Sequence, residues 1–323
     1  MNIEIGLNEA GQRLDKFLRK LLKDVPLSAI FKALRKGDVR VNGKKQKENY
    51  SLVLGDLITI KYITSNTKNE TKRKFQTVDV TNLRTVYEDE NMLLVEKWPG
   101  VLVHADRQGG EPTLNDYVLS YLFKKGDYIP ENEITFTPAP CNRLDRNTSG
   151  IVFFGKNFES LKMLNEIIRE REVEKYYSAL VKGKIKDGRY EAFITKDEGI
   201  NKSQVFHDNR PDTKRIVMDV KVLETDGLFS MLEIELVTGR SHQLRAHLSF
   251  LGNPIIGDNK YGDKKLNSFF ENKYGLTYQF LYAYKAVFRN VPEKYEYLKN
   301  KTVTQALPPI FKKIRRDVFK FRF

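Results

Sequence analysis

The feature that most constrains the fold is a series of short apolar segments between residues 151 and 291, separated by turn and charged residues. Segments such as SALVKG (178–183), YEAFIT (190–195) and SMLEIELV (230–237) have the length and the β-branched and aromatic content of strands. Two stretches have helical spacing instead, residues 158–171 and a helix after Ser241 that ends at Gly252. Many strands with a few helices predict an α+β domain built on a mixed or antiparallel sheet.

Residues 1–62 read as a separate small unit. Apolar residues recur at helical spacing over 14–22, and a second helix is expected from Ser28 to Gly37. A short strand then enters an Asn42-Gly43 hairpin turn, and GDLITIKY closes the unit as a strand. Residues 63–82 are polar without an apolar period, which predicts a flexible linker to a second domain at 83–323 that ends in a basic tail.

The charge of the chain indicates a polyanionic partner. Lys and Arg number 56 against 42 Asp and Glu, for a net charge of +14, and residues 1–61 hold 13 against 7. Charge alone does not separate RNA, DNA and a membrane surface, and a basic run is often only a solvated helical face. Within this unit we take Arg35, Lys36 and Arg40 as candidate contacts to a nucleic acid.

Composition also bounds the compartment and the cofactors. One cysteine predicts a reducing environment, and the absence of a signal region or an apolar run of about 20 residues predicts a cytoplasmic protein without membrane contact. The sequence has no HExxH, paired-cysteine or Gly-rich nucleotide motif, so we expect no metal and no cofactor. No obligate protein partner is implied, and we expect a monomer.

The stretch CNRLDRNTSG (141–150) contains the first candidate for chemistry. Asp145 lies between Arg143 and Arg146, and nearby positive charge favours an ionised carboxylate. Turn residues follow and lead into an apolar strand at 151–154, so the carboxylate is expected on a tight loop above a rigid sheet. This arrangement suits catalysis, and it equally suits a structural ion pair. Cys141 has no evident histidine base and is expected to be a packed thiol.

Two further segments have a similar chemical character. EKYYSALVKG brings Tyr176 and Tyr177 into a strand, where one tyrosine of such a pair usually faces the core and the other faces solvent. TGRSHQLRAH sets several polar side chains at a loop-to-helix junction, and an arginine there is ordinarily a surface ion pair. The candidates in this segment are Arg240, His242, Gln243 and Arg245.

Together and in this order, the three segments closely resemble the RluA family of pseudouridine synthases. That family has an HRLD motif followed by TSG, a KxYxALV-type segment, a TGRxHQxRxH segment and a GDxxYG turn, and the likeness here covers residues 82 to about 290. Residues 1–62 resemble the S4 RNA-binding domain. The resemblance implies a pseudouridine synthase fold behind a small S4-like α/β domain, and an RNA substrate. It is strongest to the RluC and RluD types, which act on large-subunit ribosomal RNA; transfer RNA stays open as a substrate.

The resemblance also implies roles for individual residues. Asp145 matches the essential aspartate, Tyr177 the tyrosine that stacks on the target uracil, and Arg245 the arginine that pairs with the aspartate, which we expect as a two-point contact. Arg143 matches an arginine that can fill the space left by the flipped base. The expected supporting residues are Arg240, His242 and Gln243. Asn142 stands where the family usually has His, which we interpret as a change in loop support. Whether the carboxylate attacks the sugar or the base stays undecided from sequence.

Two other classes of function compete with this interpretation. A non-catalytic RNA-binding factor for ribosome assembly would have the same basic surface, but loss of activity tends to erode the three matched residues, all of which are present. A DNA-binding regulator would call for a recognition helix or a basic zipper, and neither pattern is found. We therefore rank an RNA-modifying isomerase ahead of both.

Overall fold

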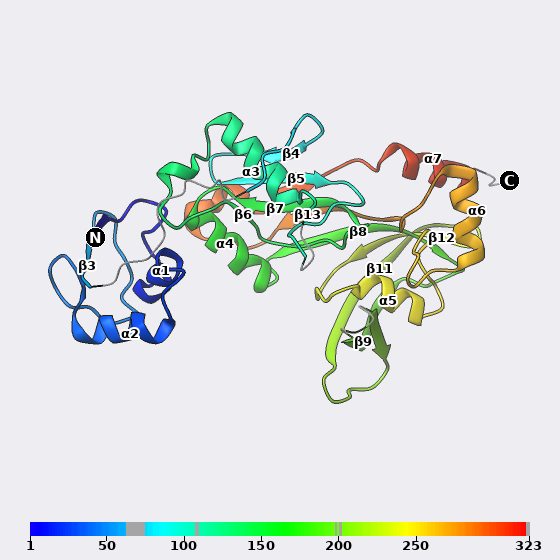
Figure 1. Ribbon diagram of the computed structural model, residues 1–323. Helices are drawn as coiled ribbons and strands as arrows, with labels where there is room; N and C mark the ends of the chain where they lie inside the picture. Colours follow the sequence, from blue (N-terminus) through cyan, green and yellow to red (C-terminus); the bar gives the residue numbers. More distant parts are fainter. Residues whose placement is uncertain (63–74, 107–109, 198, 200–201, 321–323) are drawn as a thin grey trace.

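The computed structural model describes residues 1–62, 75–106, 110–197, 199 and 202–320 (Figure 1). No helix in these ranges is both long and apolar enough to cross a bilayer. The first of the ranges forms a small unit at one end of the molecule, and the others form a larger α+β domain.

The N-terminal unit has two helices against a small antiparallel sheet. Its elements are β1 (Asn2–Glu4), α1 (Leu14–Leu21), α2 (Leu27–Lys36), β2 (Val39–Val41) and β3 (Leu57–Ile60), with the described strands in the order β1-β3-β2. The helix spacing seen in the sequence places Phe17, Leu18 and Leu34 in its core. Gly37 ends α2 in a left-handed conformation, with φ of 81°. The expected α/β unit is confirmed.

The larger domain is built on one long mixed sheet. Its strands are β4 (Arg84–Glu88), β5 (Met92–Lys97), β6 (Ala139–Pro140), β7 (Ser149–Gly155), β8 (Val173–Lys182), β9 (Gly188–Asp197), β10 (Lys202–Phe206), β11 (Lys214–Thr225), β12 (Phe229–Glu235), β13 (Leu281–Phe288) and β14 (Thr302–Thr304). In the described residues the order is β10-β9-β11-β12-β8-β13-β7-β5-β4, with β14 beside β13 and β6 beside β7. The β13–β7 pairing is parallel and its neighbours are antiparallel, so the expected mixed sheet is confirmed.

Helices cover both faces of this sheet. They are α3 (Leu114–Lys125), α4 (Phe158–Arg169), α5 (Gln243–Phe250), α6 (Lys264–Tyr274) and α7 (Pro309–Phe319). Strand β8 shows how the faces divide: Tyr177, Ala179 and Val181 pack with residues of α3 and α5, whereas Leu180 packs with residues of α6 and α7. This alternation follows from the two-residue period of a strand. The site described below lies on the α5 face.

Two expectations about this domain change with the structure, those for the basic tail and for the linker. The basic tail contains a helix, α7. Of the expected linker, residues 63–74 lie outside the described residues, whereas the ring of Phe75 is buried in the core and Val78 N donates to Ser120 Oγ at 3.1 Å.

The N-terminal unit contacts the larger domain through polar side chains. Glu9 Oε1 accepts from Thr135 N at 3.1 Å, and Asn8 Nδ2 donates to Glu133 Oε1 at 2.8 Å. Asn8 Oδ1 also accepts from the backbone N–H of Phe158, in the first turn of α4, at 3.1 Å. These bonds dock the unit beside α4, as the arrangement in Figure 1 also shows.

Candidate active site

Asp145 lies on the loop that joins β6 to β7. Thr148 N donates to Asp145 O at 3.0 Å and closes the turn behind the carboxylate. The side chain of Gln279 adds a bond to Thr148 Oγ1 at 3.0 Å, with both residues buried. These two hydrogen bonds fix the turn, which leaves Asp145 in a defined position.

Lys97, at the end of β5, also holds the Asp145 loop through hydrogen bonds. Its side chain is fully buried, and Nζ donates to the carbonyl oxygens of Arg146 (2.8 Å), Val101 (2.8 Å) and Trp98 (3.1 Å). Burial lowers the pKa of Lys97 to about 7, against the nearby negative charge of Asp145, which raises it. Nothing in the sequence singled out Lys97, because lysine is rarely buried.

The glycine of the TSG motif is required by close packing of the strands. Gly150 has φ of 124°, and a Cβ there would lie 2.2 Å from the carbonyl oxygen of Ala283 on β13. No side chain fits in that space, so glycine permits the parallel pairing of β7 with β13 directly after the Asp145 loop.

Arg245 lies in α5 and joins two carboxylates. Its Nη1 donates to Asp145 Oδ2 at 2.9 Å, while Nε and Nη2 donate to Asp258 Oδ2 (2.7 Å) and Oδ1 (2.9 Å). The expected two-point contact with Asp145 is thus wrong: the planar fork engages Asp258, because Asp258 faces the Nε edge of the guanidinium. Asp145 accepts a single hydrogen bond, from Nη1 of the same guanidinium.

Asp258 is a second residue, besides Lys97, that the sequence did not assign to the site. It belongs to the GDNKYG turn, which was identified as a motif without a role for its carboxylate. Burial would raise the pKa of Asp258, but Arg245 and the backbone N–H groups of Lys260 and Tyr261 hold it below its ordinary value. An ionised, buried Asp258 therefore orients Arg245.

Tyr177 of β8 faces Asp145, and Tyr176 faces the other way. The Tyr177 side chain is 6% exposed and belongs to the same core cluster as Leu144 and Leu244. Burial, and secondarily the charge of Asp145, raise the pKa of Tyr177, so its hydroxyl stays protonated at neutral pH. Tyr176 OH donates to Glu174 instead, at 2.8 Å.

The residues before α5 differ in what they touch. His242 Nε2 lies 4.0 Å from Asp145 Oδ2, and its Nδ1 lies 2.9 Å from Tyr261 OH. Burial lowers the pKa of His242, which favours the neutral ring. Gln243 bonds to Thr238, to the backbone N–H of Arg240 and to Val217 O, so it fixes the loop and does not face Asp145.

The other candidates lie outside this cluster. The side chains of Arg240 and Arg143 are exposed, Arg143 on the Asp145 loop itself. Arg35, Lys36 and Arg40 are exposed on the N-terminal unit and do not reach the Asp145 site; Arg40 donates to the carbonyl oxygens of Gly37 and Gly43, at 3.2 Å each.

Asn142 and Cys141 are structural in their contacts. Asn142 Oδ1 accepts from Phe153 N at 2.9 Å, which ties the start of the loop to β7. Burial raises the pKa of the Cys141 thiol to about 12, so it is not a thiolate at neutral pH.

Comparison with known proteins finds a matching family for each of the two domains. The profile of the RNA pseudouridylate synthase family matches residues 91–250, and that of the S4 domain matches residues 12–58. Ribosomal large subunit pseudouridine synthase C of Vibrio vulnificus (strain CMCP6) is 34% identical over 286 residues, 87% of this chain and 86% of that one. The protein of the same name from Escherichia coli (strain K12) is 34% identical over 289 residues, with the same coverage.

A solved structure shares the fold. Human RNA Pseudouridylate Synthase Domain Containing 4 superposes with a TM-score of 0.57 at 22% identity, over 73% of this chain and 92% of that one. The mixed sheet, the two matched profiles and the extent of the sequence identity agree, and this chain belongs to the RNA pseudouridylate synthase family, as a member with an N-terminal S4 domain.

Proposed function

We propose that this enzyme isomerises uridine to pseudouridine in large-subunit ribosomal RNA, with Asp145, Tyr177 and Arg245 as its catalytic residues. The observation that carries the proposal is the contact of 2.9 Å between Arg245 Nη1 and Asp145 Oδ2, beside the buried Tyr177. The isomerisation needs three groups in one place: a carboxylate, an arginine that fixes its position and an aromatic ring.

The reaction breaks the bond between C1′ of the ribose and N1 of uracil and forms a bond between C1′ and C5. A proton leaves C5 and N1 gains one, so no oxidant or external energy is needed. Asp145 supplies the anionic oxygen for this exchange. Tyr177 holds the freed uracil by stacking, with its protonated hydroxyl toward Asp145. Neutral His242 lies beside the carboxylate without competing with Arg245 for it.

Base flipping has to precede the chemistry, because a stacked uracil does not reach a site on this loop. The exposed guanidiniums of Arg143 and Arg240 lie at the ends of the two segments that form the site, Arg143 on the Asp145 loop and Arg240 just before α5. We assign them to phosphates around the flipped nucleotide, and Arg143 also to the space that the base leaves.

Ribosomal RNA is favoured as the substrate by the names of the relatives and by the S4 domain with its exposed cations. The S4 unit contributes Arg35, Lys36 and Arg40 to RNA binding in this proposal. In this proposal the enzyme acts as a monomer, because one chain supplies all three catalytic residues, and it acts in the cytoplasm, where its ribosomal RNA substrate is expected.

The test in vitro is tritium release from 5-tritiated uridine in large-subunit RNA. We expect release with the wild type and with Asp219→Asn, a half-buried, ion-paired aspartate of β11 that serves as the matched control. Asp145→Asn is expected to bind the same RNA with near-normal affinity and to release no tritium above background. Wild-type release by Asp145→Asn would refute the role of this carboxylate.

A further inference from the structure

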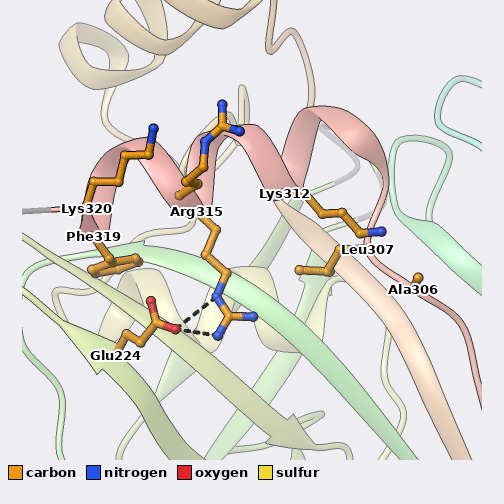
Figure 2. Close-up of a pocket in the computed structure, with 8 residues that line it drawn as sticks. Glu224, Ala306, Leu307, Lys312, Arg315, Phe319 and Lys320 are labelled. Carbon is orange, nitrogen blue, oxygen red and sulfur yellow. Dashed lines mark hydrogen bonds and ion pairs between the residues drawn. The ribbon is translucent and has the colours of Figure 1, made fainter.

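A basic groove lies beside α7, on the side of the sheet opposite to Tyr177. It has a volume of about 530 Å³ and is lined by Lys312, Arg316 and Lys320 of α7 and by Glu224 near the end of β11. Figure 2 shows the helix above the strand, with the guanidinium of Arg315 directed at Glu224. Neither the proposed catalytic residues nor the S4 unit belongs to this surface.

The helix that bears these cations is held firmly. Phe311 and Ile314 of α7 are fully buried, and the ring of Phe311 stacks on Phe280 with centroids 3.8 Å apart and an interplanar angle of 12°. Arg315 adds an ion pair to Glu224. The opposite, cationic side of α7 therefore has a fixed position on the domain and is not a free tail.

The cations form a regular row. Lys312, Arg316 and Lys320 are four residues apart, which places them on one face of the helix at intervals of about 6 Å. All three side chains are exposed. Like charges at this spacing destabilise a helix, so helix stability does not account for the row.

Few acidic groups compensate this charge. Glu224 is paired with Arg315, and Asp317 lies 3.3 Å from Arg316 Nε and 3.9 Å from Lys320 Nζ. Among the residues that the structure describes, no carboxylate lies within ion-pairing distance of Lys312. The four cations of Lys312, Arg315, Arg316 and Lys320 thus face two carboxylates, Glu224 in the lining of the groove and Asp317 beside it.

We propose that the α7 groove binds the phosphate backbone of a second helix of a large folded RNA, separate from the stem that carries the target uridine. This inference rests on the proposed function, since it assigns the groove to the same substrate. A fixed row of cations suits phosphates, which attract lysine and arginine without regard to sequence. The groove lies across the sheet from the Asp145 site and, in Figure 1, at the end of the molecule opposite to the S4 unit. We therefore expect that a large folded RNA reaches the groove and that a short stem in the active site does not.

The test combines one variant with two RNAs. The variant carries Lys312→Gln, Arg316→Gln and Lys320→Gln, which removes charge without adding repulsion against Glu224. The matched control carries Lys162→Gln, Arg169→Gln and Lys299→Gln, three exposed cations at the α4 end of the domain. The RNAs are a folded domain of large-subunit RNA and an isolated stem-loop with the same target uridine, both measured over a range of salt concentrations.

We expect the α7 variant to bind the folded RNA more weakly, with a log–log salt slope smaller by about two units. Its binding and turnover on the stem-loop should equal those of the wild type. The control should match the wild type on both RNAs. An unchanged salt slope of the α7 variant on the folded RNA, or an equal loss in the control, would overturn the proposal. Because wild-type turnover on the stem-loop is measured in parallel, its absence would identify a failure of the proposed function instead.

Discussion

At the scale of single residues, the arrangement of Arg245 between Asp145 and Asp258 predicts how the site responds to substitution. A lysine at position 245 cannot satisfy both carboxylates, because an ammonium has no planar fork. We expect Arg245→Lys to lower kcat by about a hundredfold or more, and to lower the melting temperature because Asp258 is left buried without its two-point partner.

Asp258→Asn tests whether the position of Arg245 matters separately from its contact with Asp145. It keeps the shape of the side chain and the Arg245–Asp145 contact but removes the charge that orients the guanidinium. We expect kcat to fall by about tenfold or more while RNA affinity is retained, measured by single-turnover tritium release. A wild-type kcat in Asp258→Asn would show that the fork plays no part in turnover.

The two adjacent tyrosines give a matched pair. Tyr177→Phe retains the ring that faces Asp145 but loses the hydroxyl, so RNA binding should persist while most turnover is lost. Tyr176→Phe loses a hydrogen bond to Glu174 on the other face and should have near-normal turnover. A greater loss of turnover in Tyr176→Phe than in Tyr177→Phe would show that the uracil binds on the Tyr176 face of β8.

His247 predicts a pH dependence of stability. Burial lowers the pKa of His247 to about 4 from an ordinary value of 6.5, so the folded state favours the neutral ring. Its contribution to stability is complete above about pH 6.5 and is lost as the pH falls toward 4, by about 3 kcal/mol. Urea unfolding at pH 7 and pH 4.5 should therefore show a smaller loss of stability for His247→Leu than for the wild type. An equal loss of stability in the two proteins would show that His247 is not the source of the pH dependence.

At the scale of elements, the sequence predicted those with strong periodic patterns. The helices α1, α2, α4 and α5 and the strands β8, β9 and β12 agree with the expected segments, because their apolar period reports the buried face directly. Helix α7 was taken for a tail because its charged residues outnumber the apolar ones on its buried face. Asp258 and Lys97 were missed because their partners are set by tertiary structure and leave no local pattern.

Polar contacts contribute to the docking of the S4 unit, in addition to the packing of Ile134 against the core of that unit. Asn8 and Glu9 bond to Glu133, Thr135 and the first turn of α4. We expect Asn8→Ala with Glu9→Ala to free the unit without unfolding it, because its own core contains neither residue. The measurement is the distance distribution between spin labels at Lys36→Cys and Lys162→Cys in a Cys141→Ser background, because Cys141 is only partly buried.

A narrow distribution in the background without the alanines, and a broad one in the double alanine variant, would support docking. Glu4→Ala, in β1 of the same unit, is the matched control and should leave the distribution narrow. Equally narrow distributions in all three proteins would show that these bonds do not hold the unit.

At the scale of the whole molecule, the S4 unit and the catalytic domain should divide binding from chemistry. A chain that begins at residue 75 keeps the buried ring of Phe75 and should fold. We expect it to retain kcat on large-subunit RNA, with a higher KM and a smaller salt slope, because the cations of the S4 unit are lost. Arg35→Gln, Lys36→Gln and Arg40→Gln together should reproduce part of this effect in the full chain. Equal KM and equal slope in the shortened chain would show that the unit does not deliver this RNA.

The central claim is that this enzyme makes pseudouridine in large-subunit ribosomal RNA through Asp145. The most direct measurement is chemical mapping of pseudouridine in total RNA from cells that lack the gene, complemented with the wild type or with Asp145→Asn at equal expression. We predict that specific large-subunit positions lose pseudouridine on deletion, regain it with the wild type and stay unmodified with Asp145→Asn. Recovery of those positions with Asp145→Asn, or loss confined to transfer RNA, would contradict it.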